Sequence, residues 1–423
     1  MRALALALAL VALPAVSSAQ ESALDGLRSS TDPASRLRLG RALRRAGRFD
    51  EAVRVLNAIR DRAVRPDAMW EIAQVRFDQG SFRPAEAACR NVTPAFRQRV
   101  CRARADLVWN RVALANRELN AAQSQGSSDG EYQLALADAR RLMSDVSAAT
   151  NAYNAASQLL PGRAEPFLGL AALQEIAQRP DDAEAQYRRA VATDPTDPAA
   201  ALALGRFLLR RRGNATEALP FLQRASADRP HWAEALGAYG EALVGTGAHA
   251  QALPILEEAA RLSPTQPGVQ TALGQALAGA ERWTDAEAHF RRAIEQVGTD
   301  AQAYMGLADV MEHTDRDTEA MEQWDHAIDR APGSQYARMR AARLAHRTHQ
   351  NALARAYLDR ILSDNPQMAE ALALRGMVAA DENDRPSARR FLNAALGGNG
   401  PIDRNAVQEA LRALEQPVRQ RRR

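Results

Sequence analysis

Few side chains in this chain of 423 residues are of the types that catalyse reactions, and those few are widely scattered. The chain has two cysteines, Cys89 and Cys101, and no histidine occurs within 120 residues of either one. A nucleophilic cysteine needs a neighbouring base and a recognisable sequence context, and neither is evident here. The sequence therefore argues against cysteine catalysis and leaves the two thiols a structural role.

Histidine spacing gives one candidate metal pair. His346 and His349 are three residues apart, a spacing that can place both side chains on one helix face. They fall near a predicted turn and no third ligand is close in sequence, so we predict no metal site. All 55 basic residues are arginine, and a phosphate-binding P-loop, which needs lysine, is therefore excluded. Since no hydrolase or dinucleotide motif occurs either, we predict a protein that is not an enzyme and has no cofactor.

The elements that must position these residues recur with a fixed period. Proline or glycine stands at intervals of 34 or 35 residues through most of the chain. The positions are Pro161, Pro195, Pro230, Pro264, Gly298, Pro332, Pro366 and Gly400. A period of this length is typical of a solenoid, in which one supersecondary unit packs on the next.

Each period contains the same pattern of small and large apolar residues. After Pro264 the pattern consists of Leu273, Gly274, Leu277, Ala286, Phe290 and Ala293. It resembles the tetratricopeptide repeat, in which small residues lie where two antiparallel helices approach closely and a proline ends the unit. The resemblance implies an all-α fold, a right-handed α-solenoid of stacked antiparallel helix pairs. It also implies a concave surface that is lined by the first helix of each pair.

The clarity of the repeat divides the chain into regions. We expect degenerate repeats over 36–127 and a regular array over 128–400. Together these regions contain about nine repeats in phase and one stretch, at 95–127, in which the pattern is blurred. That stretch is either a long helix or an irregular helical pair. Residues 401–416 are predicted to form a capping helix, with an apolar face of Val407, Ala410, Leu411 and Leu414. Residues 20–35 are expected to be a linker and 417–423 a basic tail.

Residues 1–19 have the pattern of a secretory signal peptide. Arg2 precedes an apolar run of about thirteen residues, and the small residues Ser17, Ser18 and Ala19 suit cleavage after Ala19. The run is too short to cross a bilayer, and no later segment approaches the required length. We therefore expect a periplasmic or secreted protein without a transmembrane segment after cleavage.

Export bears on the two cysteines. In the repeat pattern Cys89 takes the position of Tyr187 and Phe290 between paired helices, and Cys101 follows on the next helix. Helices that pack antiparallel can bring these two positions together, and an oxidising compartment favours a disulfide. The alternative is two buried thiols that act as small apolar residues.

Charge is unevenly distributed along the chain. Residues 32–111 contain 18 arginines and 9 acidic residues, whereas 112–418 are net acidic. A basic region attracts anionic partners, and an exported protein is not expected to bind nucleic acid. The alternative partner is therefore an anionic envelope polysaccharide or lipid head groups. We expect such a partner to bind through Arg41, Arg44 and Arg48. A solvated helical surface without a partner explains the same pattern.

The resemblance places a candidate groove on the concave side. Its first-helix positions are Arg206, Arg210, Met305, Asp309, His313, Tyr336, Met339, Arg343, His346, Arg347 and Met377. Arginine, aromatic and methionine side chains are typical of protein-binding surfaces. Our main interpretation is a non-catalytic exported scaffold that binds a protein or peptide, in the assembly of the cell envelope, pili or secretion machinery, as the resemblance implies.

Overall fold

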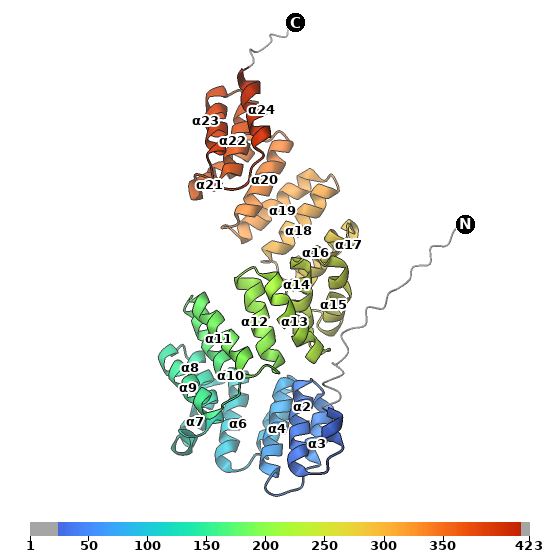
Figure 1. Cartoon of the computed structure of the whole chain (residues 1–423), viewed down its shortest axis with the longest axis vertical. Coiled ribbons are helices and arrows are strands. Elements are labelled where there is room, and N and C mark those ends of the chain that lie inside the picture. The colour runs from blue at the N-terminus through green and yellow to red at the C-terminus, as the bar shows by residue number, and fades with distance from the viewer. Residues whose placement is uncertain (1–23, 416–423) are drawn as a thin grey trace, which may run out of the picture. The chain divides into compact units, whose positions relative to one another are not determined.

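The computed structural model describes residues 24–415, and every regular element in that range is a helix (Figure 1). The predicted all-α class is therefore confirmed. The chain divides into two compact units, unit 1 at 1–266 and unit 2 at 267–423. The predicted signal peptide at 1–19 and the predicted basic tail at 417–423 lie outside the described residues.

Between residues 24 and 266, unit 1 contains seven hairpins, each made of two consecutive helices that pack against one another. In chain order the helices are α2 (Pro33–Arg45), α3 (Phe49–Asn57), α4 (Arg65–Asp78), α5 (Phe82–Cys89), α6 (Ala95–Val108), α7 (Val112–Gly126), α8 (Gly130–Leu142), α9 (Val146–Leu159), α10 (Glu165–Ile176), α11 (Pro180–Thr193), α12 (Pro198–Arg211), α13 (Ala215–Asp228), α14 (Ala233–Gly245) and α15 (His249–Leu262).

Unit 2 contains four more hairpins and a final helix. Its helices are α16 (Val269–Gly279), α17 (Trp283–Gln296), α18 (Ala301–His313), α19 (Asp317–Arg330), α20 (Gln335–Arg347), α21 (Asn351–Asp364), α22 (Ala369–Asp381), α23 (Arg385–Leu396) and α24 (Arg404–Glu415). The sequence predicted about ten repeats, so the eleven hairpins within 24–415 exceed the predicted number by one.

Left-handed residues make the turns between paired helices. Some of these turns use glycine, such as Gly47 and Gly80, whereas others use Asn110, Ser144 or Glu281 with φ between 57° and 61°. Asn110 forms the turn between α6 and α7, and this is why the sequence from 95 to 127 shows no glycine or proline where the two helices meet. The stretch is a helical pair, because asparagine tolerates the left-handed conformation better than most residues with a Cβ.

The recurring pattern of Leu followed by Gly has a steric cause at two well-defined positions. A Cβ added at Gly205 would lie 2.5 Å from Cγ of Leu222, and one at Gly274 would lie 2.7 Å from the ring of Phe290. Both partners belong to the second helix of the same hairpin and are fully buried. Glycine therefore lets the two helices approach closely enough for a bulky side chain to fill the space between them.

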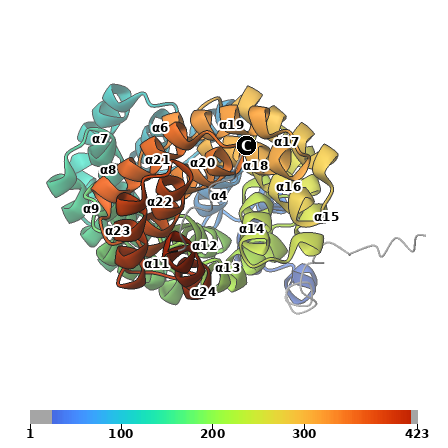
Figure 2. The ribbon, with the colours of Figure 1, turned by 90° about the horizontal axis from the view of Figure 1, so that it is seen from above.

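Each unit curves with its first helices on the inside. The first helices of neighbouring hairpins touch one another, as α2 touches α4 and α16 touches α18, whereas second helices make no comparable contact in the described part of the chain. In unit 1 the hairpins from α6 to α14 follow a curve when seen from above (Figure 2). The inner surface of a unit is therefore formed by α2, α4 and the first helices that follow.

The ends of the described chain are packed on the terminal hairpins. Leu24 is buried against the hairpin of α2 and α3, and α2 begins at Pro33, so much of the predicted linker at 20–35 belongs to the fold. At the other end α24 packs on α22 and α23, with Val407 buried against Leu372 and Leu392. None of the helices between 24 and 415 is long and apolar enough to span a bilayer.

Candidate functional site

The inner surface of unit 1 encloses a hollow of about 700 Å³, which we call the charged hollow. Helices α2, α4, α6 and α8 form one side of it. The loops that connect successive hairpins, at 160–165, 194–199 and 229–232, form the other side. Its charged side chains are Arg41, Arg44, Arg45, Asp67, Glu71, Asp78, Arg97, Arg104, Glu131, Arg163, Glu165, Asp194, Asp197 and Arg229.

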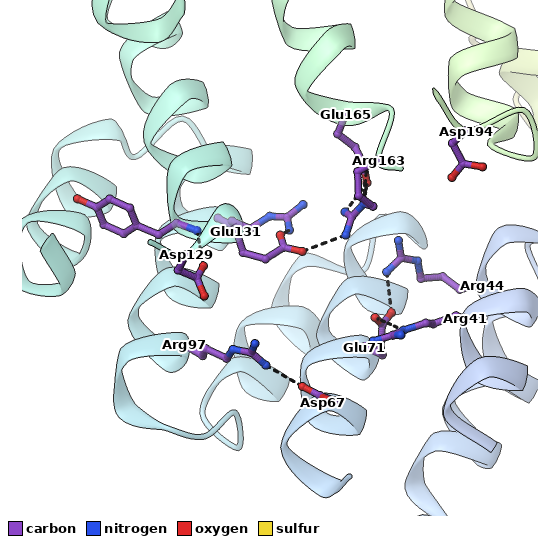
Figure 3. A network of polar contacts seen from close by, with 12 residues as sticks. Arg41, Arg44, Asp67, Glu71, Arg97, Asp129, Glu131, Arg163, Glu165 and Asp194 are labelled. Atoms are coloured by element: carbon purple, nitrogen blue, oxygen red, sulfur yellow. Dashed lines mark hydrogen bonds and ion pairs between the residues drawn. The ribbon is translucent and has the colours of Figure 1, made fainter. Parts of the chain in front are cut away.

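Ion pairs connect adjacent helices across the charged hollow (Figure 3). The nearly buried carboxylate of Glu71 on α4 accepts hydrogen bonds from Arg41 at 2.8 Å and from Arg44 at 2.9 Å, both on α2. Arg97 on α6 donates to Asp67 on α4 at 2.7 Å. These charge-assisted bonds hold the arginine side chains in place and leave their outer edges facing the hollow.

Arg163 forms the other side of the same network. Its guanidinium donates to Glu131 at 3.0 Å and to Glu165 at 2.8 Å, and Glu131 also accepts from Arg104 at 3.0 Å. Burial by itself would raise the pKa of Glu165, but the hydrogen bonds and charge of Arg163 outweigh it and hold that pKa at about 2. Glu165 is therefore charged at neutral pH and stays paired with Arg163.

A contact between distant hairpins closes the charged hollow. Arg45, at the end of α2, donates to Asp194 at 2.8 Å and to the hydroxyl of Thr196 at 3.0 Å. Arg229 in turn donates to the backbone carbonyl of Arg45 at 2.8 Å. We call this set of bonds the closing contact. Solenoid hairpins normally touch only their neighbours, and these partners are 149 to 184 residues apart.

Arg229 is the more enclosed of the two arginines in the closing contact. Its side chain is 13% exposed and lies over the rings of Phe49 and Trp232, with its guanidinium carbon 5.9 and 4.9 Å from the ring centroids. Burial lowers the pKa of the Arg229 guanidinium, and Asp78 opposes that shift from 3.6 Å. Since arginine remains charged throughout the physiological range, the closing contact includes a permanent buried cation.

One polar group in the charged hollow is unpartnered. The side chain of Gln74 on α4 is 5% exposed, and its amide nitrogen has no hydrogen-bond acceptor within the described residues. A buried amide donor without an acceptor is costly, so an acceptor from solvent or from a bound molecule is required. A peptide carbonyl that enters the hollow can supply it.

A second hollow of about 420 Å³ continues the inner surface, and it shares Ala199 and Trp232 with the first. We call it the aromatic hollow. Leu202 and the neighbouring rings of Tyr187 and Phe207, 5.3 Å apart, line it. Arg206, Arg210, Arg211, Glu175 and Glu234 complete the lining. The two hollows together form a groove with a charged part and an apolar part.

Two of the residues predicted from the sequence lie together in this groove. Arg206 pairs with Glu234, and Arg210 donates to Glu241 at 2.9 Å, so each links α12 to α14. Both side chains remain more than one-third exposed. Exposed pairs of this kind contribute little to stability and can exchange for the carboxylate of a ligand.

The remaining predicted groove residues belong to unit 2, and the structure brings three of them to one cluster. Arg340 bonds Asp309 at 2.7 Å and donates to the hydroxyl of Tyr336 at 3.2 Å. Arg347 reaches Glu312 at 3.2 Å, and Glu312 also bonds Arg340. Burial raises the pKa of Asp309, although Arg340 opposes that shift. Arg340, at the centre of this cluster, was not among the predicted residues.

Other predicted residues of unit 2 have separate partners. His313 stacks on Trp283, Arg343 pairs with Glu370, and His346 bonds Asp381 at 2.9 Å. His349 occupies a left-handed turn, and no group of three metal-ligating side chains occurs among residues 24–415.

The methionines were wrongly assigned to an open groove. Met305 and Met339 are 6% and 5% exposed, and Met377 is partly buried in the cluster that includes Leu372 and Leu392. These three positions of the first helix face the neighbouring helices, because apolar side chains there fill the layer between hairpins.

The basic early region does not present unpaired arginines in the way the sequence suggested. Arg41 and Arg44 bond Glu71, and Arg48 pairs with Glu51. The excess of arginine over acid in 32–111 is thus partly used in contacts between hairpins. An anionic polymer bound through these three residues is not supported.

Several groove residues escaped prediction from the sequence. Glu71, Gln74, Arg163 and Arg229 lie on helix faces or loops that the repeat pattern leaves unspecified. One sequence signal was available, since Asp194 and Arg229 are the charged residues at the position before the period-marking proline or glycine.

Cys89 and Cys101 are bonded to each other in the structure, with their Cα atoms 5.4 Å apart and both side chains buried. The bond joins α5 to α6 within the cluster that contains Trp70 and Leu119. It closes a loop of 12 residues.

We expect thiol titration of the denatured, unreduced protein to detect no free sulfhydryl. Reduction should lower the unfolding free energy of unit 1 by about 3 kcal/mol, because opening so short a loop restores chain entropy to the unfolded state. A variant with Cys89→Ala and Cys101→Ala is the control and should not respond to reductant. Two titratable thiols in the untreated wild-type protein would show that the bond does not form.

The stacked hairpins and the lined inner groove define a class, the helical-repeat binding proteins. Two models of the tetratricopeptide repeat match the chain, one at 37–98, 271–335 and 339–404 and the other at 175–239 and 209–276. The matches together cover more than half of the chain, so it belongs to the tetratricopeptide repeat family. YrrB, a tetratricopeptide repeat protein whose structure has a peptide-binding site, is 23% identical over 45% of this chain and 97% of its own, with a TM-score of 0.36.

The chain is similar to several solved structures. The Cut9–Hcn1 hetero-tetramer of the APC/C is 13% identical, with 94% of this chain and 85% of that chain aligned and a TM-score of 0.50. A tetratricopeptide repeat protein from Parabacteroides merdae ATCC 43184 is 18% identical over 60% of this chain and 99% of its own, with a TM-score of 0.43. PilW, a type IV pilus biogenesis factor, is 20% identical over 48% and 94%, with a TM-score of 0.41. No curated protein sequence matches the chain.

Proposed function

We propose that this protein is a non-catalytic scaffold that binds an extended segment of another protein in the inner groove of unit 1. The proposal rests mainly on the continuity of the two hollows, which share Trp232. The charged hollow contains the unpartnered amide of Gln74, and the aromatic hollow contains the apolar surface of Phe207. A peptide offers both a backbone carbonyl for the amide and an apolar side chain for the aromatic hollow.

The ion pairs of the groove suit a ligand with charged side chains. Arg206 and Arg210 lie at the rim of the aromatic hollow and pair with Glu234 and Glu241 respectively. A carboxylate on the ligand can replace either glutamate as the partner of its arginine. The exchange replaces one exposed ion pair with another, so it costs the scaffold little stability. Sequence selectivity then depends on the apolar side chain that fills the space beside Leu202 and Phe207.

Photo-crosslinking in cells tests this placement. A benzoylphenylalanine at Ala203, which lines the aromatic hollow, should give a protein adduct of defined mass. Charge reversal at Arg206 and Arg210 should weaken binding at least tenfold, since each charge-assisted contact contributes about 1.5–3 kcal/mol. The amount of the Ala203 crosslinked adduct should decrease in this double variant.

Two controls accompany the crosslinking experiment. The same probe at Ala192, an exposed residue of α11 that lines neither hollow, should give no such adduct. Arg261→Glu, which changes an exposed arginine on α15, should leave the Ala203 adduct unchanged. Equal crosslinking from Ala192 and Ala203 would contradict the assignment of the groove.

We also propose that the protein is exported and acts in the assembly of the cell envelope, pili or secretion machinery. The composition of residues 1–19 and the bond between Cys89 and Cys101 support export, because such bonds persist in oxidising compartments. In unit 2 the exposed side chains of Tyr336, Arg343 and Arg347 are proposed as a further contact for the partner. Fractionation of the cells, with detection of the cleaved chain, tests the compartment.

A further inference from the structure

Large apolar side chains are exposed along one edge of unit 1, at the turns between the paired helices. One or two of them occur at each of four consecutive hairpins, close to the left-handed residues Gly80, Asn110, Ser144 and Gln178. We call them the turn ridge, and they are Phe82, Val108, Trp109, Leu142, Met143 and Ile176, with exposed fractions between 38% and 60%.

Contacts link neighbouring hairpins within part of the turn ridge. The rings of Phe82 and Trp109 meet edge to face at 6.3 Å, and the amide of Asn116 on α7 reaches the sulfur of Met143 at 2.8 Å. At the left-handed turns of unit 2 the preceding residues are instead Ala280, Thr314, Thr348 and Glu382. Exposed apolar residues gathered in this way mark interaction surfaces, whereas isolated ones carry no such meaning.

A basic hollow of about 270 Å³ lies directly beside the turn ridge. Arg111 connects the two, since it lines the hollow and its guanidinium carbon lies 4.9 Å from the Trp109 ring centroid. Leu114, which is also exposed, forms part of the same hollow. The other arginines there are Arg90, Arg102 and Arg117.

The available charge of the basic hollow is positive. Its three carboxylates are already paired within the chain: Asp106 and Glu86 with Arg111 at 2.9 and 3.6 Å, and Glu118 with Arg99 at 3.2 Å. Arg90, Arg102 and Arg117 have no ion pair within residues 24–415. A partner that fits this surface therefore combines apolar side chains with carboxylates.

We propose that the turn ridge and the basic hollow form a second docking site, and that its occupant is an acidic amphipathic helix of a partner protein. Packed helices lie about 8–10 Å apart, and seven residues of a helix rise about 10.5 Å. A helix laid across the turns thus presents one apolar residue to each hairpin at every seventh position. Its neighbouring carboxylates reach the arginines of the basic hollow.

This site goes beyond the inner groove, because none of its residues lines the charged or the aromatic hollow. A chain with both sites can hold two proteins at once. The two sites are distinguishable by mutation, since the turn ridge and the groove share no side chain.

The test uses the full chain and a labelled synthetic helix of 21 residues with leucine at every seventh position and glutamate as the main polar residue. A twin peptide has arginine in place of glutamate. We expect fluorescence anisotropy to show the acidic peptide binding at least tenfold more tightly than its twin. Trp109→Ser with Met143→Ser, and separately Arg102→Glu with Arg117→Glu, should each weaken it about tenfold.

The controls distinguish this site from the inner groove and from a loss of folding. Arg206→Glu with Arg210→Glu alters only the inner groove and should leave binding of the acidic peptide unchanged. Ile176→Ser, at the far end of the turn ridge, provides an independent variant if the double serine variant does not fold. Circular dichroism and the bond between Cys89 and Cys101 report whether each variant is intact.

Three results would overturn the proposal. One is equal binding of the acidic peptide and its twin, and another is acidic-peptide binding that survives all three variants of this surface. The third is a different occupant of the site, seen when the acidic peptide does not bind. That occupant would be a second copy of the chain if the wild-type protein forms dimers in sedimentation and the ridge variants do not. It would be a membrane if the wild-type protein binds vesicles of phosphatidylcholine and phosphatidylglycerol and the ridge variants do not.

Discussion

A chain that ends after Gly400 is expected to lose several kcal/mol of stability in its last hairpins and to self-associate. The deletion removes α24 and uncovers the apolar surface of α22 and α23, which includes Leu372, Leu392 and Ala395. Val407 is almost fully buried, and Leu411 and Leu414 are partly so. Burial of a large apolar side chain contributes about 1.5–3 kcal/mol, so the expected loss is about 4–6 kcal/mol.

The effect should be local. In a linear stack each hairpin depends mainly on its neighbours, so faster hydrogen exchange is expected first in 369–396 and hardly at all in unit 1. A chain that ends after Glu415 is the matched control and should behave as wild type, because it retains α24. Sedimentation and hydrogen exchange measure the outcome, and a monomeric deletion variant with unchanged exchange would show that α24 does not act as a cap.

The second large effect is expected from Arg229→Ala. The substitution removes the hydrogen bond to the carbonyl of Arg45 and the contacts with the rings of Phe49 and Trp232. A hydrogen bond from a charged group contributes about 1.5–3 kcal/mol, and a partly buried cation–π contact about 1 kcal/mol. We therefore expect the closing contact to weaken by about 3–5 kcal/mol.

Hydrogen exchange distinguishes this result from general destabilisation. Amides of α2 and α3 should exchange at least a hundredfold faster, since the first hairpin then retains its packing on α4 and the Arg45 bonds to Asp194 and Thr196 but loses the contacts of Arg229, while those of α10 to α13 should change little. Arg188→Ala removes a more exposed arginine that pairs with Glu184 and should cost less than about 1 kcal/mol. Unchanged protection of α2 in Arg229→Ala would mean that the closing contact contributes nothing.

These two variants also bear on binding. Arg229 contributes to the wall of the charged hollow, and Trp232 belongs to both hollows. Loss of the closing contact therefore changes the groove in which we place the partner segment, whereas removal of α24 leaves all groove residues in unit 1 untouched. A difference between the two variants in crosslinking from Ala203 would locate the function in unit 1.

The hairpins could be predicted well because their determinants are local in sequence. Gly205 and Leu222, or Gly274 and Phe290, lie 16 or 17 residues apart and meet within one hairpin. The 34-residue spacing of prolines marks where each hairpin ends. The turn at Asn110 was missed for a related reason, since a residue other than glycine adopts the left-handed conformation there and the sequence offers no conspicuous breaker.

The methionines show the limit of transferring positions from a repeat pattern. Met305 and Met339 belong to the first helix, as predicted, but a helix has several faces. A shift of one position turns a side chain by about 100°, from the inner surface to the layer between hairpins. Side-chain type did not resolve this, because methionine suits both a core and a binding surface.

The class of fold, the helix pairs and the family could be predicted from the sequence, since these depend on contacts within about 34 residues. Which distant hairpins meet could not be predicted, because it depends on the packing of the whole of unit 1. Small rotations between hairpins accumulate along unit 1 until Arg45 reaches Asp194 and Arg229, up to 184 residues away. The repeat pattern does not specify the total rotation between the first and the later hairpins. The closing contact, the charged hollow and the unpartnered amide of Gln74 could therefore not be predicted from the sequence.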